Sequence, residues 1–297
     1  MTPTAPPCSP PSSSPPAIAR AVEVRRDPTT AARTPVECAD FVSCGRFAWR
    51  HVGGVVQIAH SLDERTISDT AVVEGLVALV EAGVISGQAQ FEEAAVRVIR
   101  TSAATPADAW AAFYDNSLRE LASGAASFAP VHRRARSLVA GPTILEVGSC
   151  FGFFALACAA DGLRVAACDI SPGAISKLSR AARRRGVDVD AAVGDATALP
   201  YPDDSFDTVT LIHLLEHLDA PAAVDALGEA LRVARRRVVV GVPFEDHPSA
   251  HFGHHLRLTE RDLHAWAARV PHAGAEVLID HGGWLVLTPP PGSPSFR

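Results

Sequence analysis

The stretch that decides the fold is Ile144-Leu145-Glu146-Val147-Gly148-Ser149-Cys150-Phe151-Gly152, in which an apolar run ends in two glycines. The apolar run predicts a buried strand, and the glycines permit a tight turn and the close approach of a ligand to the backbone. The next residues, 153–160, predict a helix whose first N–H groups have no partner within the helix. Such a strand–turn–helix unit either binds a ligand at its turn or simply reverses the chain.

Short apolar runs alternate with helical segments throughout the C-terminal half of the chain. Strands are expected at residues 143–148, 164–170, 188–193, 208–213, 237–242, 276–280 and 284–288. Helices are expected at residues 153–160, 172–185, 221–234 and 259–270. This alternation predicts an α/β fold with a Rossmann-like seven-stranded sheet, mostly parallel and covered by helices on both faces. Only residues 281–283 join the last two strands, so we expect a C-terminal antiparallel hairpin there.

The distribution of proline indicates where the folded part of the chain begins and ends. Of the 23 prolines, nine lie in residues 1–35 and four in 289–294, so we expect disordered Pro/Ser-rich tails at 1–35 and 289–297. Between the tails we expect a mainly helical N-terminal region at 36–132 and the sheet domain at 133–288. Within the N-terminal region, helical spacing covers residues 67–84, 88–99 and 106–121, and residues 47–60 can form a hairpin.

The composition argues against several classes of protein. Lys+Arg 27 against Asp+Glu 33 leave a net charge of −6, and without a basic face we expect no nucleic-acid partner. No secretory signal and no apolar stretch of membrane-spanning length is visible, so we expect no membrane partner. None of the six cysteines forms a C-x-x-C pair, and three lie in apolar segments typical of reduced thiols. These features predict a soluble, cytoplasmic protein whose oligomeric state the sequence does not define.

Three acidic residues, Glu146, Asp169 and Asp195, lie at the ends of the first three expected strands. Asp169 follows Gly148 by 21 residues, the separation at which an acid accepts ribose hydroxyls. Because the carboxyl ends of parallel strands meet at one edge of the sheet, these acids suit a ligand that carries an amine, a ribose and an adenine. The dinucleotide fingerprint fails at Cys150 and Phe153, which argues against an NAD-dependent dehydrogenase.

Four ordered motifs, at residues 146–152, 168–172, 194–196 and 199–207, resemble those of class I S-adenosylmethionine-dependent methyltransferases of the type 11 group. The resemblance covers roughly residues 130–288 and implies S-adenosyl-L-methionine as cofactor, with S-adenosyl-L-homocysteine as its product. Cys150 departs from the family, which usually has glycine at this position. Its Cβ narrows the methionine end of the cofactor site.

The resemblance also implies a role for individual residues. Glu146 would lie near the methionine amine, Asp169 would hold the ribose, and Asp195 would meet the adenine edge. The implied cofactor-binding set is Glu146, Gly148, Ser149, Cys150, Gly152, Asp169, Ile170, Asp195, Ala196 and His213.

Two histidine-rich segments follow the fourth and fifth expected strands. Methyl transfer to a hydroxyl requires a group that removes the proton, and histidine suits that task. The candidate catalytic bases are His217, His213, His254 and His255.

Residues 213–217 also have the H-x-x-E-H form of a zinc-protease motif, which requires a continuous helix where a strand is expected. The same segment resembles the Glu-x-x-Glu-His segment of ubiquinone-pathway O-methyltransferases, which is associated with a divalent cation. A metal held by His213, Glu216 and His217 is therefore an alternative, but the favoured interpretation is that no metal is bound.

The expected acceptor is a hydroxyl on a small molecule or an oligosaccharide, since the chain offers no Lys/Arg-rich cleft for nucleic acid. The full-length layout looks most like the mycofactocin oligosaccharide methyltransferases, which would make the acceptor a glucose hydroxyl. In such enzymes the N-terminal region, here 36–132, commonly covers the active site and shapes acceptor binding. Methylation of a quinone, a phenol or another natural product is one alternative, and a non-catalytic cofactor-binding subunit is another.

Overall fold

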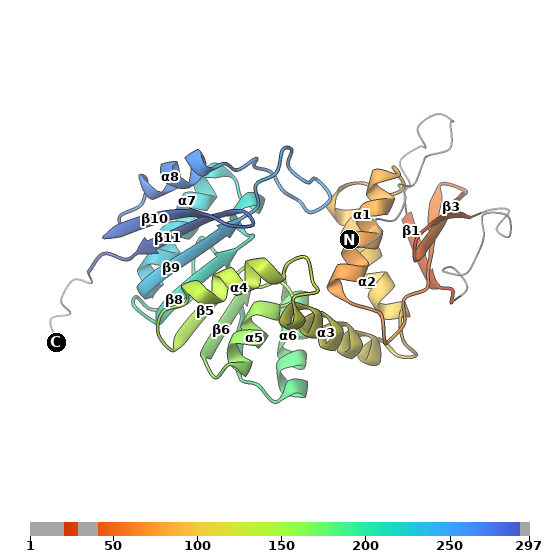
Figure 1. The fold of residues 1–297 in the computed structure, drawn as a ribbon, viewed down its shortest axis with the longest axis horizontal. Helices are drawn as coiled ribbons and strands as arrows, with labels where there is room; N and C mark the ends of the chain where they lie inside the picture. The colour runs from red at the N-terminus through yellow and green to blue at the C-terminus, as the bar shows by residue number, and fades with distance from the viewer. Residues whose placement is uncertain (1–20, 29–40, 292–297) are drawn as a thin grey trace. The chain divides into compact units, whose positions relative to one another are not determined.

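The computed structural model describes residues 21–28 and 41–291, and its chain divides into two units (Figure 1). The first unit runs to Ala126 and also includes Ser249–Gly253; the second unit contains residues 127–248 and the chain from His254 onward. The boundary between the units lies six residues before the expected one, because the helix at 129–138, which was not expected, belongs to the second unit.

The second unit contains the seven-stranded sheet that the sequence predicts. Its strands are β5 (Thr143–Val147), β6 (Arg164–Asp169), β7 (Val189–Val193), β8 (Phe206–Ile212), β9 (Ala234–Val242), β10 (Gly274–Ile279) and β11 (Gly283–Thr288). Its helices are α4 (Ala129–Leu138), α5 (Phe153–Ala160), α6 (Pro172–Arg185), α7 (Ala220–Val233) and α8 (Glu260–Ala267). Every strand and helix expected in this part of the chain is present.

The strand order in this sheet is β10-β11-β9-β8-β5-β6-β7. The pairs β5–β6, β6–β7, β5–β8 and β8–β9 are parallel, whereas β11 is antiparallel to both β9 and β10, which confirms the expected hairpin. The order reverses between β5 and β8, since the chain adds β6 and β7 on one side of β5 before it crosses to β8. Ligands of open α/β sheets bind outside the carboxyl ends of the strands at such a reversal.

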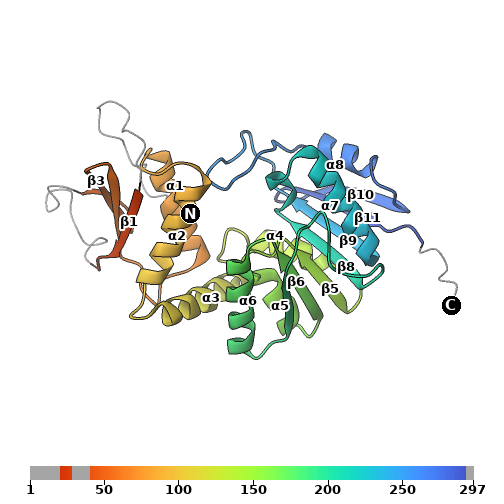
Figure 2. The same cartoon turned by 180° about the vertical axis from the view of Figure 1, so that it is seen from behind.

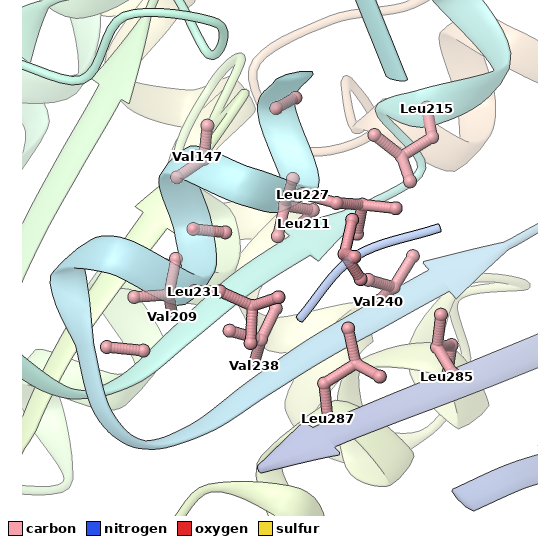
Figure 3. Packing of buried hydrophobic residues seen from close by; sticks show 14 of the residues in the cluster. Val147, Val209, Leu211, Leu215, Leu227, Leu231, Val238, Val240, Leu285 and Leu287 are labelled. Carbon is pink, nitrogen blue, oxygen red and sulfur yellow. The ribbon is translucent and has the colours of Figure 1, made fainter. Parts of the chain in front are cut away.

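Apolar side chains of the sheet pack against α7 and α8 to form the core of the second unit (Figure 3). Its members alternate along the strands, as with Val209 and Leu211 in β8 and Val238 and Val240 in β9, and all four are fully buried. Helix α4 lies over one face of this sheet (Figure 1), and α7 covers the opposite face (Figure 2). The sheet is therefore enclosed between layers of helices.

The first unit combines three helices with a four-stranded sheet. Its helices are α1 (Asp69–Glu81), α2 (Gly87–Thr101) and α3 (Pro106–Ser123), and its strands, in sheet order, are β1 (Ala21–Arg26), β4 (Val55–His60), β3 (Phe47–Val52) and β2 (Val42–Cys44). The expected hairpin is the antiparallel pair β3–β4. Phe113, Tyr114 and Leu118 of α3 are buried, so this face of the helix belongs to the core of the first unit.

Strand β1 corrects the expectation of a tail over residues 1–35. Residues 21–26 pair in parallel with β4, and Val22 is buried, because a partner strand more than 30 residues away supplies the hydrogen bonds that the segment lacks locally. Residues 1–20 and 29–35 of the expected tail, and 292–297 of the C-terminal tail, lie outside the described residues.

Among the described residues, none of the helices combines the length and the apolarity that crossing a bilayer requires. Cys150, Cys158 and Cys168 are reduced thiols, as expected for cysteines in apolar segments, whereas Cys44 is disulfide-bonded. Of the three reduced thiols only Cys150 is exposed; Cys158 and Cys168 are buried.

The C-terminal hairpin depends on Trp284, which is 1% exposed, lies against Gly241 of β9, and donates a hydrogen bond from its indole nitrogen to the Asp280 carbonyl at 2.9 Å. We expect Trp284→Ala to lower the free energy of unfolding by about 3–5 kcal/mol, because the cavity cannot refill. Ile279 of the same hairpin is 61% exposed, so Ile279→Ala should stay within about 0.5 kcal/mol of wild type. Denaturant titration of both variants checks this, and equal losses would contradict the account.

Candidate functional site

The turn after β5 is held open by its glycines. Gly148 and Gly152 have φ angles of 71° and 68°, in the left-handed region that glycine adopts without strain. A Cβ at Gly148 would collide with Leu214, and a Cβ at Gly152 would collide with Leu178 of α6. Cys150 shares the left-handed conformation with a φ of 48°, although it has a side chain, and its thiol is exposed. The turn therefore exposes backbone at the carboxyl end of β5, directly before α5.

Asp169 ties the end of β6 to this turn. Its Oδ2 accepts a hydrogen bond from the backbone N–H of Cys150 at 2.8 Å, and its Oδ1 accepts one from Ser171 at 2.8 Å. The N–H groups of Gly148 and Ser149 both donate to the carbonyl of Cys168, at 2.9 and 3.0 Å. The acid expected to hold a ribose thus also fixes the glycine turn, and each oxygen keeps a second lone pair for a ligand.

Glu146 lies in β5 beneath the turn and is 6% exposed. One of its oxygens accepts a hydrogen bond from the N–H of Ala155, in the first turn of α5, at 2.9 Å. Burial raises the pKa of Glu146 to about 8, against the opposing effect of that hydrogen bond, and the nearby Asp169 raises it further. A cation placed beside Glu146 would offset this desolvation, as expected for a residue that meets an ammonium group.

The ends of β6 and β7 present apolar surface next to polar groups. Ile170 and Val193 are 74% and 52% exposed. Asp195 is exposed, and hydrogen bonds from the backbone N–H and hydroxyl of Thr197 keep the pKa of its carboxyl below the usual value. Ala196 packs on the edge of the core. An exposed aliphatic side chain beside an ionised acid suits a flat heterocycle with an amino group.

Ser149 supplies another polar group at the turn. The residue is 6% exposed, and within the described part of the chain its hydroxyl has no hydrogen-bond partner. Buried hydroxyls are normally paired, so Ser149 is a group that a ligand at this edge can satisfy.

The segment after β8 contacts the same turn, since Leu214 lies against Gly148. The neighbouring His213 has a φ of 52° and packs edge-on against Phe128, with ring centroids 4.7 Å apart. Burial, followed by the influence of His254, lowers the pKa of His213 to about 3, so its ring is neutral. His132 of α4 lies between Phe128 and Phe154, and burial lowers its pKa to about 4.

His213 belongs to a group of imidazoles and carboxylates that we call the His/Glu cluster. Its members are His213, Glu216, His217, Glu245 and His254. The rings of His217 and His254 meet edge-on with centroids 5.0 Å apart, and Nδ1 of His254 lies 2.8 Å from Oε2 of Glu245. Glu216 is 1% exposed, with Oε1 3.5 Å from Nδ1 of His213. Burial raises the pKa of Glu216 to about 8.

Three of the four expected catalytic histidines therefore converge in this cluster, whereas the side chain of His255 is exposed. The backbone N–H of His255 instead donates to the carbonyl of Glu216 at 2.8 Å, which fixes the β9–α8 loop beside the segment after β8. Sequence reasoning assigned no role to Glu245 or Phe128. The only signal for Glu245 was its place in a histidine-rich loop, nine residues before its partner.

Comparison with known proteins agrees with this geometry. Residues 145–240 match the sequence profile of the family described as "Methyltransferase domain". The chain is 37% identical over 111 residues to a demethylmenaquinone methyltransferase from Renibacterium salmoninarum, covering 37% of this chain and 44% of that protein. It is 40% identical over 103 residues to the demethylmenaquinone methyltransferase of Clavibacter sepedonicus, covering 34% of this chain and 40% of that protein.

Among solved structures, the chain is similar to the PH0226 protein from Pyrococcus horikoshii OT3, with 18% identity and a TM-score of 0.47 over 55% of this chain and 89% of that one. The chain spans less than half the length of the two curated relatives above. Residues 145–240 of the sheet domain are therefore similar to a methyltransferase domain.

The raised pKa of Glu146 predicts a pH-dependent cost to folding. Below pH 4.5, the pKa of this carboxyl in the unfolded chain, Glu146 is protonated in both the folded and the unfolded state. Between pH 4.5 and about 8 it loses its proton only in the unfolded chain, so the free energy of unfolding falls as pH rises. Glu146→Gln removes this term, and its advantage over wild type should grow by a few kcal/mol between about pH 5 and pH 8, at about 1.4 kcal/mol per pKa unit. Chemical denaturation across this range tests it. The exposed Glu276→Gln is the control, and a parallel curve for Glu146→Gln would contradict the assignment.

Proposed function

We propose that this protein is an S-adenosylmethionine-dependent methyltransferase that methylates a hydroxyl group. The observation that carries the proposal is the placement of Glu146, Asp169 and Asp195 at the carboxyl ends of three adjacent parallel strands, beside a glycine turn at the reversal of strand order. An amine, a ribose and an adenine on one ligand match these three acids in that order. The match of residues 145–240 to a methyltransferase domain supports the same ligand.

The residues at this edge fit the cofactor. Glu146 would meet the methionine ammonium and Asp169 the ribose hydroxyls, while the buried hydroxyl of Ser149 would gain a partner that none of the described residues supplies. Ile170, with most of its side chain exposed, would lie beside the adenine, and Asp195 would accept from its amino group. The implied contacts of Gly148, Cys150, Gly152, Ala196 and His213 follow from their places in or against the same edge.

Bound S-adenosylmethionine supplies an activated methyl group on a sulfonium. The protein then has to align the acceptor oxygen with that methyl group, exclude bulk water from the sulfonium, and remove the hydroxyl proton. The His/Glu cluster follows β8 and β9, whose carboxyl ends lie at the same edge as those of β5 and β6. His217, His213 and His254 are therefore placed to orient the acceptor and handle its proton. His255, whose side chain is exposed, is the weakest of the four candidates.

Cofactor binding tests the proposal directly. We expect calorimetric titration with S-adenosylhomocysteine to give one site per chain, and Asp169→Ala to weaken it about 10- to 100-fold through the loss of charge-assisted hydrogen bonds. Asp169 also fixes the turn after β5. Asp169→Asn retains one accepting oxygen and should therefore weaken S-adenosylhomocysteine binding less than Asp169→Ala does.

The matched control is Asp161→Ala, which removes an exposed acid at the end of α5 that pairs with Arg136. This variant should bind S-adenosylhomocysteine as wild type does. Saturable binding of NAD in place of S-adenosylhomocysteine would refute the proposed function.

Two acceptor classes follow from different observations. The mycofactocin-like layout of the chain supports a glucose hydroxyl of an oligosaccharide, which is our specific proposal. The 37% identity to a demethylmenaquinone methyltransferase supports a quinone or phenol as the second candidate.

We expect enzyme supplied with methyl-labelled cofactor to label a glucose-terminated oligosaccharide and not a demethylated quinone, with mass spectrometry placing the methyl group on oxygen. Labelling confined to the quinone would replace the first acceptor with the second. If neither acceptor is labelled while S-adenosylhomocysteine binds, the case for a non-catalytic binding subunit is strengthened.

A further inference from the structure

We propose that the His/Glu cluster is a divalent transition-metal site, with Glu216, His217 and His254 as its three protein ligands. The inference deepens the proposed function, since the site adjoins the proposed methyl donor. A carboxylate oxygen of Glu216 and one ring nitrogen each from His217 and His254 all lie within 4.8 Å of one another. Ligand atoms around a tetrahedral zinc lie ~3.4 Å apart, so closing on an ion requires a shift of at most about 1.4 Å between any pair.

The environment of Glu216 independently points to a ligand. The residue is 1% exposed, and neither carboxylate oxygen accepts a hydrogen bond from another residue in the described part of the chain. A buried carboxylate is expensive unless it is paired with a cation or fully hydrogen-bonded. One ring nitrogen each of His217 and His254 lies within 4.8 Å of a Glu216 oxygen, and an ion held between the three groups would pair the buried carboxylate with a cation.

Glu245 supplies the supporting contact that metal-bound histidines usually have. Its Oε2 lies 2.8 Å from Nδ1 of His254, which leaves Nε2 as the ligand nitrogen of that ring. The hydrogen bond from the N–H of His255 to the carbonyl of Glu216 fixes the loop that carries His254 against the segment that carries His217. The ligands thus come from two separate elements, held by a backbone contact between them.

This ligand set differs from the His213, Glu216 and His217 set considered from the sequence, because His254 takes the place of His213. The His213 ring instead packs on Phe128. Two imidazoles and one carboxylate favour Zn²⁺ or a neighbouring first-row ion over Mg²⁺ or Ca²⁺, which prefer oxygen ligands. Three protein ligands leave a position open for an exogenous oxygen.

An acceptor hydroxyl is the oxygen that this open position would hold. Coordination would lower the pKa of the hydroxyl, whose proton leaves to solvent, so His217 and His254 would act here as metal ligands and not as the proton acceptors considered above. The oxygen then forms its bond to the methyl carbon as the bond from carbon to sulfur breaks, and that electron pair stays on sulfur. Charge balances, because the sulfonium loses its positive charge as the alkoxide loses its negative one.

Metal binding can be measured without turnover. Full-length protein is dialysed against a chelator and titrated with ZnCl₂ by calorimetry; Co²⁺ absorption reports the donor set, and MgCl₂ serves as a competitor. We expect one Zn²⁺ per wild-type chain, not displaced by Mg²⁺. Glu216→Gln and His254→Ala should abolish saturation at concentrations that saturate wild type, and Glu245→Gln should weaken it about 10- to 100-fold.

The matched control is His264→Ala, which removes an exposed imidazole of α8 outside the His/Glu cluster and should leave Zn²⁺ affinity unchanged. Folding of each variant is checked by thermal unfolding and by S-adenosylhomocysteine binding on the same samples. Wild type that binds no Zn²⁺, or His254→Ala that binds it as wild type does, would overturn the metal site. If S-adenosylhomocysteine binds in that case, the proposed function stands alone; if wild type fails to bind it, the proposed function fails separately.

Discussion

The structure around the site depends on one carboxylate. Asp169 accepts hydrogen bonds from two backbone N–H groups, that of Cys150 in the loop after β5 and that of Ser171 directly before α6. With this acid in place, the left-handed turn at Gly148 and Gly152 leaves room for Leu214 and Leu178, and the segment after β8 comes to lie on the segment after β5. A single side chain thus holds the turn after β5 and is also the residue that we propose to bind the ribose.

The chemistry of the site divides along the sheet. The carboxyl ends of β5, β6 and β7 present acids and exposed aliphatic side chains, which suit a cationic nucleoside, whereas the segments after β8 and β9 present imidazoles and buried carboxylates. The two halves meet where the strand order reverses, with Leu214 on Gly148 as the contact between them. A methyl donor on one half and an acceptor oxygen on the other would therefore face each other across this line.

Local signals were enough to predict much of this arrangement. The bounds of α5 and α6, the seven strands and the antiparallel hairpin follow from apolar periodicity, capping residues and a three-residue connection. Strand β1 could not be predicted in this way, because its six residues lie inside a Pro-rich segment and pair with β4 only through long-range contacts. Nor could the pairing of Glu245 with His254, since a loop without periodicity gives no indication of which side chains converge.

The carboxyl edge of β5, β6 and β7 is the proposed cofactor site, and a crystal structure of the protein with S-adenosylhomocysteine tests that placement most directly. We predict the ribose on Asp169, the amino acid end beside Glu146, and the adenine between Ile170 and Asp195. A ligand bound at any other edge of the sheet, or at the turn with its ribose away from Asp169, would contradict it.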